Sequence, residues 1–126
     1  MTEPRRNILV VEDNEANQML ARAVLELEGY AVEIAGSVAE AFDVLGEHRP
    51  DLILMDVQLP KLSGLDATRL LRADPRTAKI PLVVVTSFAL SGDDRRAIDA
   101  GASAYLAKPY SPRDLMALIN RFLPGN

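Results

Sequence analysis

Leu52-Ile53-Leu54-Met55-Asp56 consists of four apolar residues followed by a carboxylate, near the middle of a chain of 126 residues. Two further apolar runs have the same form, one at residues 8–11 and one at residues 82–85. A strand is apolar at every position when helices cover both faces of a parallel sheet. The three runs therefore predict the central strands of a buried parallel sheet.

Helical patterns alternate with these runs. The first predicted helix ends at Gly29, and its apolar stripe consists of Ala16, Met19, Leu20, Ala23, Val24 and Leu27. A second helix begins at the capping box Ser37-Val38-Ala39-Glu40 and ends before Pro50, and its apolar residues are Val38, Ala41, Phe42 and Leu45. A third helix is capped by Ser63 and extends to about Arg72.

Two more helices and two short strands complete the pattern. The fourth helix follows a cap at 91–94, and its expected buried residues are Ala97, Ile98 and Ala100. The fifth opens at Ser111-Pro112, and its apolar face consists of Leu115, Leu118, Ile119, Phe122 and Leu123. Residues 31–35 alternate at their centre like an edge strand, and residues 103–107 form the last strand.

Five strand–helix units with right-handed crossovers predict an α/β domain of three layers, with helices on both faces of the sheet. The simplest order that achieves this with five strands is the flavodoxin-like order 2-1-3-4-5. In that order the first and third strands flank the switch point, where open α/β sheets bind ligands. We expect the pocket of this protein at that edge.

Composition restricts the classes of function. Apolar residues make up 48% and charged residues 25% of the chain, as in an ordinary globular domain. The net charge of −4 argues against nucleic-acid binding by this chain alone. No apolar run approaches membrane-spanning length, and the absence of cysteine excludes disulfides and thiolate metal sites.

Polar residues follow the predicted strands at the carboxyl edge of the sheet: Glu12, Asp13, Asp56, Thr86 and Lys108. Neighbouring strands lie roughly 5 Å apart, so the three carboxylates repel one another. A like-charge pair at about 4 Å costs on the order of 4 kcal/mol at an effective dielectric of 20, and one lysine offsets a single charge. The set therefore suits Mg²⁺, with Mn²⁺ as the alternative ion, and an incoming phosphoryl group.

Asp56 has the position of a nucleophile. A carboxylate can attack phosphorus to form an acyl phosphate, and it needs no general base because it is ionised at pH 7. Each residue alone also has a plain structural role: Asp13 could cap a helix, Thr86 could end a strand and Lys108 could be a solvated surface lysine. Their convergence on one edge of the sheet favours the functional interpretation.

Several motifs together resemble the receiver domain of two-component response regulators: Glu12-Asp13, Pro50 to Asp56, Leu59-Pro60, Ser63-Gly64-Leu65, Val85-Thr86 and Lys108-Pro109. The resemblance covers residues 6–123. It implies that Asp56 is the phosphoacceptor and that the metal takes Glu12, Asp13, Asp56 and the backbone carbonyl of Gln58. It also implies that Thr86 is the switch hydroxyl, Tyr105 the switch aromatic, and Lys108 the phosphate-binding lysine before a cis bond to Pro109.

The same resemblance implies a cytoplasmic signalling protein, not an enzyme beyond its own phosphorylation and dephosphorylation. We expect a single receiver domain over residues 1–126 without an output domain, similar to stand-alone or hybrid-kinase phosphorelay receivers, as a monomer or weak homodimer. His48 is the only histidine and is expected at the surface, so the phosphoryl donor is another molecule. The implied partners are a histidine kinase or histidine phosphotransfer protein and a downstream protein target, whose binding changes through the face of the fourth helix, fifth strand and fifth helix.

Three alternatives remain at this point. An aspartate-nucleophile phosphatase typically has a second acid two residues after its nucleophile, and here that position is Gln58. A flavin-binding electron carrier of the same fold would present amides and hydroxyls to a phosphate, whereas Glu12 and Asp13 repel one. A receiver used only for docking, without phosphorylation, would have no need of the intact set of acids and lysine.

Overall fold

The computed structural model describes residues 6–59, 63–87 and 93–124. The strands are β1 (Asn7–Val11), β2 (Ala31–Ala35), β3 (Leu52–Asp56), β4 (Leu82–Thr86) and β5 (Ala104–Ala107). The helices are α1 (Glu15–Leu27), α2 (Val38–Glu47), α3 (Gly64–Ala73), α4 (Asp93–Ala100) and α5 (Pro112–Phe122). The expected cap at 91–92, and Pro60 of the receiver motif, lie outside the described residues. In the described part of the chain, no helix has the length and apolar character needed to span a bilayer.

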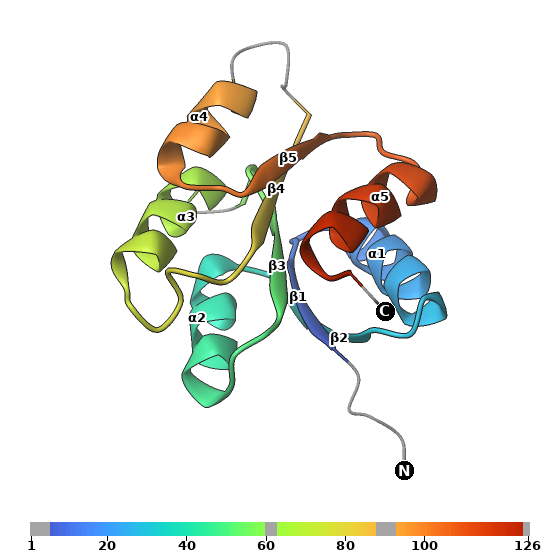
Figure 1. The fold of residues 1–126 in the computed structure, drawn as a ribbon, viewed down its shortest axis with the longest axis horizontal. Coiled ribbons are helices and arrows are strands. Elements are labelled where there is room, and N and C mark those ends of the chain that lie inside the picture. The colour runs from blue at the N-terminus through green and yellow to red at the C-terminus, as the bar shows by residue number, and fades with distance from the viewer. Residues whose placement is uncertain (1–5, 60–62, 88–92, 125–126) are drawn as a thin grey trace.

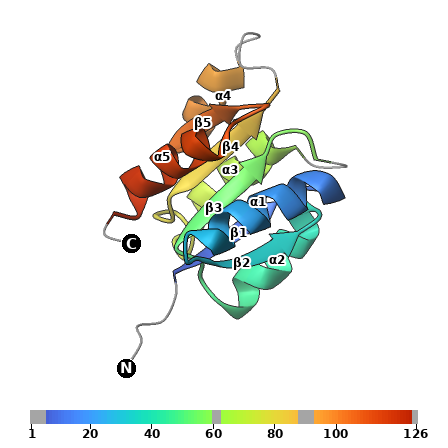
Figure 2. The same ribbon diagram turned by 90° about the vertical axis from the view of Figure 1, so that its right-hand side faces the viewer.

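The sheet is parallel and has the order β2-β1-β3-β4-β5, which confirms the predicted flavodoxin-like topology. Helices α2, α3 and α4 cover one face, and α1 and α5 cover the other (Figure 1 and Figure 2). Alternate residues of each central strand therefore enter two different cores. In β1, Leu9 and Val11 pack toward α2 and α3, whereas Ile8 and Val10 pack toward α1 and α5. This explains why the central strands are apolar at every position.

The register of the sheet brings the polar strand ends to one edge. Val11 pairs with Met55, so the residue that follows each of them, Glu12 and Asp56, lies at the same level. Asp56 in turn pairs with Val85, next to Thr86. Thr86 pairs with Ala107, directly before Lys108. The order of the strands thus sets the order of the functional residues across the edge.

The phase of α1 differs from the predicted one. Its buried residues are Ala21 and Leu25, whereas the predicted stripe is largely exposed, with exposed fractions of 71% for Met19, 47% for Leu20 and 86% for Leu27. The helix has apolar residues on two opposite sides, and periodicity alone does not say which side meets the sheet. The smaller set faces the core, and the larger set remains on the surface.

Two other apolar residues also lie further outside than expected. In α4, Ala97 and Ala100 are buried as predicted, but Ile98 is 48% exposed. In α2, Val38 and Ala41 are buried, whereas Phe42 is 39% exposed. Each of these two residues lies next in sequence to a buried alanine, and adjacent positions on a helix are about 100° apart, so it points along the rim of the core.

Arg72, near the end of α3, joins three segments at the other edge of the sheet. Its Nε donates to the carbonyl oxygen of Gly101, just after α4, at 2.7 Å. Its Nη1 donates to the carbonyl oxygens of Ala78 at 3.0 Å and Ile80 at 2.7 Å, before β4. Its Nη2 lies 3.2 Å from Oγ of Ser103, before β5. Burial lowers the pKa of this guanidinium, yet arginine stays charged, and the carbonyl dipoles stabilise that charge.

We expect Arg72→Met to lower the free energy of unfolding by about 3 kcal/mol, because several carbonyl groups lose a charged donor at once. Arg69→Met is the matched control, since Arg69 lies one turn earlier in α3 and makes an exposed ion pair with Asp66. Its loss should change stability by less than about 1 kcal/mol. Urea denaturation followed by circular dichroism measures the stability of the two variants. Equal losses of stability would contradict the structural role given to Arg72.

Candidate functional site

Three carboxylates meet at the carboxyl edge of the sheet. One oxygen each from Glu12, Asp13 and Asp56 can be chosen so that all lie within 4.8 Å of one another. Glu12 is 6% and Asp56 4% exposed, whereas Asp13 is exposed to solvent. Burial of two like charges at this separation is unfavourable unless cations compensate for it.

Lys108 is the cation that the protein itself supplies. Its Nζ lies 3.0 Å from Oε1 of Glu12 and 3.0 Å from Oδ2 of Asp56. Burial by itself would lower the pKa of Lys108, but the hydrogen bonds to Glu12 and Asp56 outweigh it, and the pKa is raised. The lysine is therefore protonated, and its single charge faces two buried carboxylates and a third at the surface.

Backbone amides hold the two buried carboxylates in place. The N–H of Asn14 donates to Oε2 of Glu12 at 3.1 Å, and the N–H of Gln58 donates to Oδ1 of Asp56 at 3.0 Å. Each carboxylate thus has one oxygen on an amide and the other on Lys108. The peptide bond between Lys108 and Pro109 is cis, the geometry that the receiver resemblance implied.

Gly64, the first residue of α3, lies against the backbone of Asp56. Its N–H donates to the carbonyl oxygen of Val57 at 2.9 Å. A Cβ atom at this position would lie 2.0 Å from the carbonyl oxygen of Asp56. A residue with a side chain does not fit there unless the backbone moves. The glycine therefore allows α3 to start directly beside Asp56.

The remaining predicted residues lie at the end of β4 and in β5. Thr86 is fully buried, and its carbonyl oxygen accepts a hydrogen bond from the N–H of Lys108 at 2.8 Å. Tyr105 lies in β5 and is 40% exposed. Ser87, next to Thr86, is exposed. His48 lies between α2 and β3, and its partly exposed imidazole contacts the carboxylate of Glu33 in β2.

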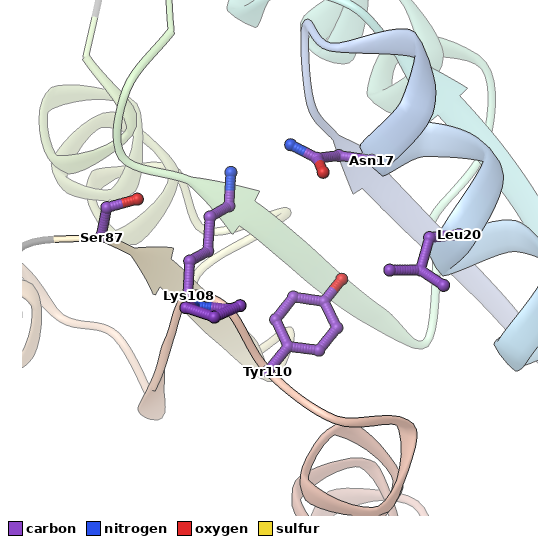
Figure 3. Close-up of a pocket in the computed structure, with 6 residues that line it drawn as sticks. Asn17, Leu20, Ser87, Lys108 and Tyr110 are labelled. Carbon is purple, nitrogen blue, oxygen red and sulfur yellow. The ribbon is translucent and has the colours of Figure 1, made fainter.

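A cavity of about 430 Å³ opens beside Lys108, between α1 and the segment after β5. Figure 3 shows Asn17 and Leu20 on one wall, and Lys108 and Tyr110 on the other. The hydroxyl group of Tyr110 is directed toward the α1 wall. Burial raises the pKa of Tyr110, and the nearby Glu12 carboxylate adds to the effect, so the phenol stays neutral. The cavity is thus lined by apolar residues, such as Leu20 and Pro109, and by polar ones, such as Asn17 and Lys108.

The geometry agrees with comparisons to known proteins. The sequence family described as the response regulator receiver domain matches residues 8–120. The chain belongs to the response regulator receiver family. It is 42% identical over 118 residues to the polar-differentiation response regulator DivK of Brucella anthropi, covering 94% of this chain and 96% of that protein.

Solved structures of other receivers have the same fold. A response regulator from Chloroflexus aurantiacus superposes with a TM-score of 0.91 at 29% identity, covering 95% of this chain and 98% of that one. The receiver domain of a sensor histidine kinase from Pseudomonas aeruginosa has a TM-score of 0.88 at 37% identity, with the same coverage of both chains. In that structure a magnesium ion is coordinated in the active-site cleft.

The acidic cluster of this receiver fits a hard divalent cation. Mg²⁺ is bound in proteins by oxygen atoms, with one or two carboxylates and several water molecules. Asp13 is exposed and offers an oxygen that solvent can reach, while Glu12 and Asp56 supply buried charge that Lys108 offsets only in part. The donor set is therefore suitable in chemistry and in spacing.

Sequence patterns did not single out three residues of this region. Asn17 and Tyr110 line the cavity beside Lys108 and also a small hollow next to Glu12 and Asp56. Gln18 contacts the backbone of Glu12. Asn17 and Gln18 lie on the side of α1 that was expected to face solvent, because the phase of this helix was predicted wrongly. A correct phase would have directed both residues toward the site.

We expect Lys108→Met to lower the free energy of unfolding by about 2 kcal/mol in metal-free buffer, because Glu12 and Asp56 lose a charged hydrogen-bond partner. Addition of Mg²⁺ should stabilise this variant more than the wild type, since the ion then replaces the missing charge. Lys79→Met is the control, because Lys79 is exposed. Thermal unfolding with and without Mg²⁺ measures both effects, and an equal response to Mg²⁺ would refute this account.

Proposed function

We propose that this receiver accepts a phosphoryl group on Asp56 from a phosphohistidine donor protein, in a reaction that depends on Mg²⁺. The observation that carries the proposal is the contact of Lys108 Nζ with both Glu12 and Asp56, at 3.0 Å each, beside the exposed Asp13. In this proposal Asp56 is the nucleophile, Lys108 the cation, and Glu12 and Asp13 the metal-binding acid pair, and the proximity of these groups supports it. Residues 6–123 act as one receiver unit in this proposal.

The chemistry follows from these positions. An oxygen of the Asp56 carboxylate attacks phosphorus, the P–N bond of the donor breaks, and its electron pair returns to the imidazole nitrogen. Phosphoryl transfer needs in-line positioning and neutralisation of charge on the transferred oxygens. Lys108 is close enough to move from Asp56 to a phosphoryl oxygen, and the hydroxyl of Thr86 can donate to another.

The metal site in this proposal consists of Glu12, Asp13, Asp56 and the backbone carbonyl of Gln58. When bound, Mg²⁺ (or Mn²⁺) offsets the charge of the acids and of the phosphoryl oxygens. Gln58 already lies beside Asp56, because its N–H donates to Oδ1 of that residue at 3.0 Å. In this proposal the three acids hold the ion. The protein catalyses only its own phosphorylation and dephosphorylation.

The proposed response is a change in the face formed by α4, β5 and α5. Phosphorylation adds roughly −1.5 to −2 charges at Asp56. Thr86 and Lys108 follow the new oxygens, and Tyr105, now 40% exposed, turns inward. Binding of a downstream protein then shifts the equilibrium between two conformations. We place this signalling in the cytoplasm, for a monomer or weak homodimer.

Acetyl phosphate with Mg²⁺ should add one phosphoryl group to the wild type and none to Asp56→Asn, because the amide lacks the nucleophilic oxygen. Asp43→Asn is the matched control, since Asp43 is exposed on α2, away from the strand ends. It should accept the phosphoryl group as the wild type does. Intact-protein mass spectrometry detects the adduct. An adduct that persists on Asp56→Asn would rule out the assignment.

The exposed stripe of α1 supports a helical donor. Ala16, Leu20, Ala23 and Leu27 have the spacing 4-3-4 along the sequence, which is the seam pattern of two packed helices. Alanine at alternate positions lets a second helix approach closely. The stripe is continuous with the site, because Leu20 also lines the cavity beside Lys108. We therefore assign this face to a helix of the histidine-bearing donor, a histidine kinase or a histidine phosphotransfer protein.

Met19→Asp should slow phosphoryl transfer from such a donor about tenfold or more, which corresponds to a loss of about 1.4 kcal/mol at the interface. Phosphorylation by acetyl phosphate should be unchanged, because Met19 is 71% exposed and is not among the residues that line the cavity beside Lys108. Leu70→Asp is the control, as Leu70 is 51% exposed on α3. Equal rates of protein-to-protein transfer in Met19→Asp and the wild type would disprove this docking face.

A further inference from the structure

Gln18, in the first turns of α1, makes a contact that takes no part in the proposed phosphoryl transfer. Its Nε2 donates to the backbone carbonyl oxygen of Glu12 at 2.6 Å. Its own backbone N–H donates to the carbonyl oxygen of Asn14 at 2.9 Å. The side chain of Gln18 therefore holds the peptide group that precedes Asp13, while its backbone makes the first helical hydrogen bond of α1. We propose that Gln18 is a positioning residue, which sets the backbone of the Glu12–Asp13 turn and thereby the metal affinity of the acid pair.

The turn is also held on either side of Asp13, at Glu12 and at Asn14, whose Oδ1 accepts from the N–H of Asn17 at 3.0 Å. The N–H of Glu12 donates to the carbonyl oxygen of Ala35 at 2.9 Å, and its carboxylate contacts Asn14 and Lys108. The carbonyl oxygen of Glu12 is the remaining polar group of that residue, and Gln18 supplies its donor. In the part of the chain that the structure describes, the Asp13 carboxylate forms no hydrogen bond. The direction of Asp13 therefore depends on the backbone that Gln18 fixes.

The position of Gln18 is itself restricted. It is half-buried, and a Cβ atom at Gly36 would lie 3.8 Å from its Nε2. The N–H of Gly36 donates to Oε2 of Glu40 at 2.6 Å, which fixes the β2–α2 turn beside the Gln18 amide. The amide is thus confined between the two turns. A neutral donor suits this place, because it binds a carbonyl group without adding charge beside the acids or competing for their oxygens.

This inference rests on the proposed function, since a precise acid pair has value only if the site binds a cation. Groups that orient metal ligands commonly contribute tenfold to hundredfold to metal affinity. Loss of the Gln18 amide should therefore weaken binding of the ion and leave the nucleophile and lysine in place. A residue with a merely structural role would instead lower overall stability and the reaction rate at every metal concentration.

The test compares the wild type, Gln18→Met and Arg22→Met. Methionine keeps the length of Gln18 and removes its donor, and Arg22 is an exposed residue one turn later in α1. Mg²⁺ alone is titrated into each protein and followed by amide NMR. We expect the dissociation constant of Mg²⁺ to rise about tenfold in Gln18→Met and to be unchanged in Arg22→Met.

Two further readouts separate positioning from folding. In metal-free Gln18→Met, hydrogen exchange at the amides of Asp13 and Asn14 should speed up, while amides of β3 and β4 stay protected. The rate of phosphorylation by acetyl phosphate should match the wild type at saturating Mg²⁺. If the wild type binds Mg²⁺ and Gln18→Met binds it with the same dissociation constant, the inference about Gln18 is wrong and the proposed function still stands. A wild type that does not bind Mg²⁺ overturns the proposed function together with it.

Discussion

The contact of one lysine with two buried carboxylates is the constraint around which this receiver is arranged. Lys108 lies 3.0 Å from Glu12 and from Asp56, and Asp13 adds a third acid within 4.8 Å. One positive charge cannot balance three negative ones, so the free protein keeps an excess of negative charge at this edge. That excess gives the site affinity for a divalent cation.

The fold keeps these like charges close together by fixing the backbone of each residue that carries one. The register of β1, β3 and β4 brings Glu12, Asp56 and Thr86 to the same edge of the sheet. The absence of a side chain at Gly64 lets α3 start against Asp56. At the opposite edge, Arg72 ties α3 to the segments after α4 and before β4. The sheet is thus anchored at one end and carries its reactive groups at the other.

The fold and the identity of the strand-end residues could be predicted from the sequence, because both depend on local patterns. Runs such as Leu52 to Met55 reveal a buried parallel strand, and the strand order follows from the need for helices on both faces. The phase of α1 could not be predicted, since Ala21 and Leu25 compete with a longer apolar stripe on the opposite side. Only packing against β1 decides between them. The contact of Gln18 with a backbone carbonyl leaves no periodic pattern, so it too required the coordinates.

The position of Lys108 has a further consequence for signalling. Its side chain contacts Asp56, while its backbone N–H donates to the carbonyl oxygen of Thr86 at 2.8 Å, so one residue links the nucleophile to the ends of β4 and β5. In the proposed acyl phosphate, the negative charge of Asp56 would lie further out, on the phosphoryl oxygens. The ammonium group then gains more from those oxygens than from the esterified carboxyl group, and its stem must follow. Because the backbone of the same residue is hydrogen-bonded to Thr86, the proposed displacement of charge at Asp56 would act on the end of β4. The interaction that stabilises the free receiver is thus the one that phosphorylation must rearrange.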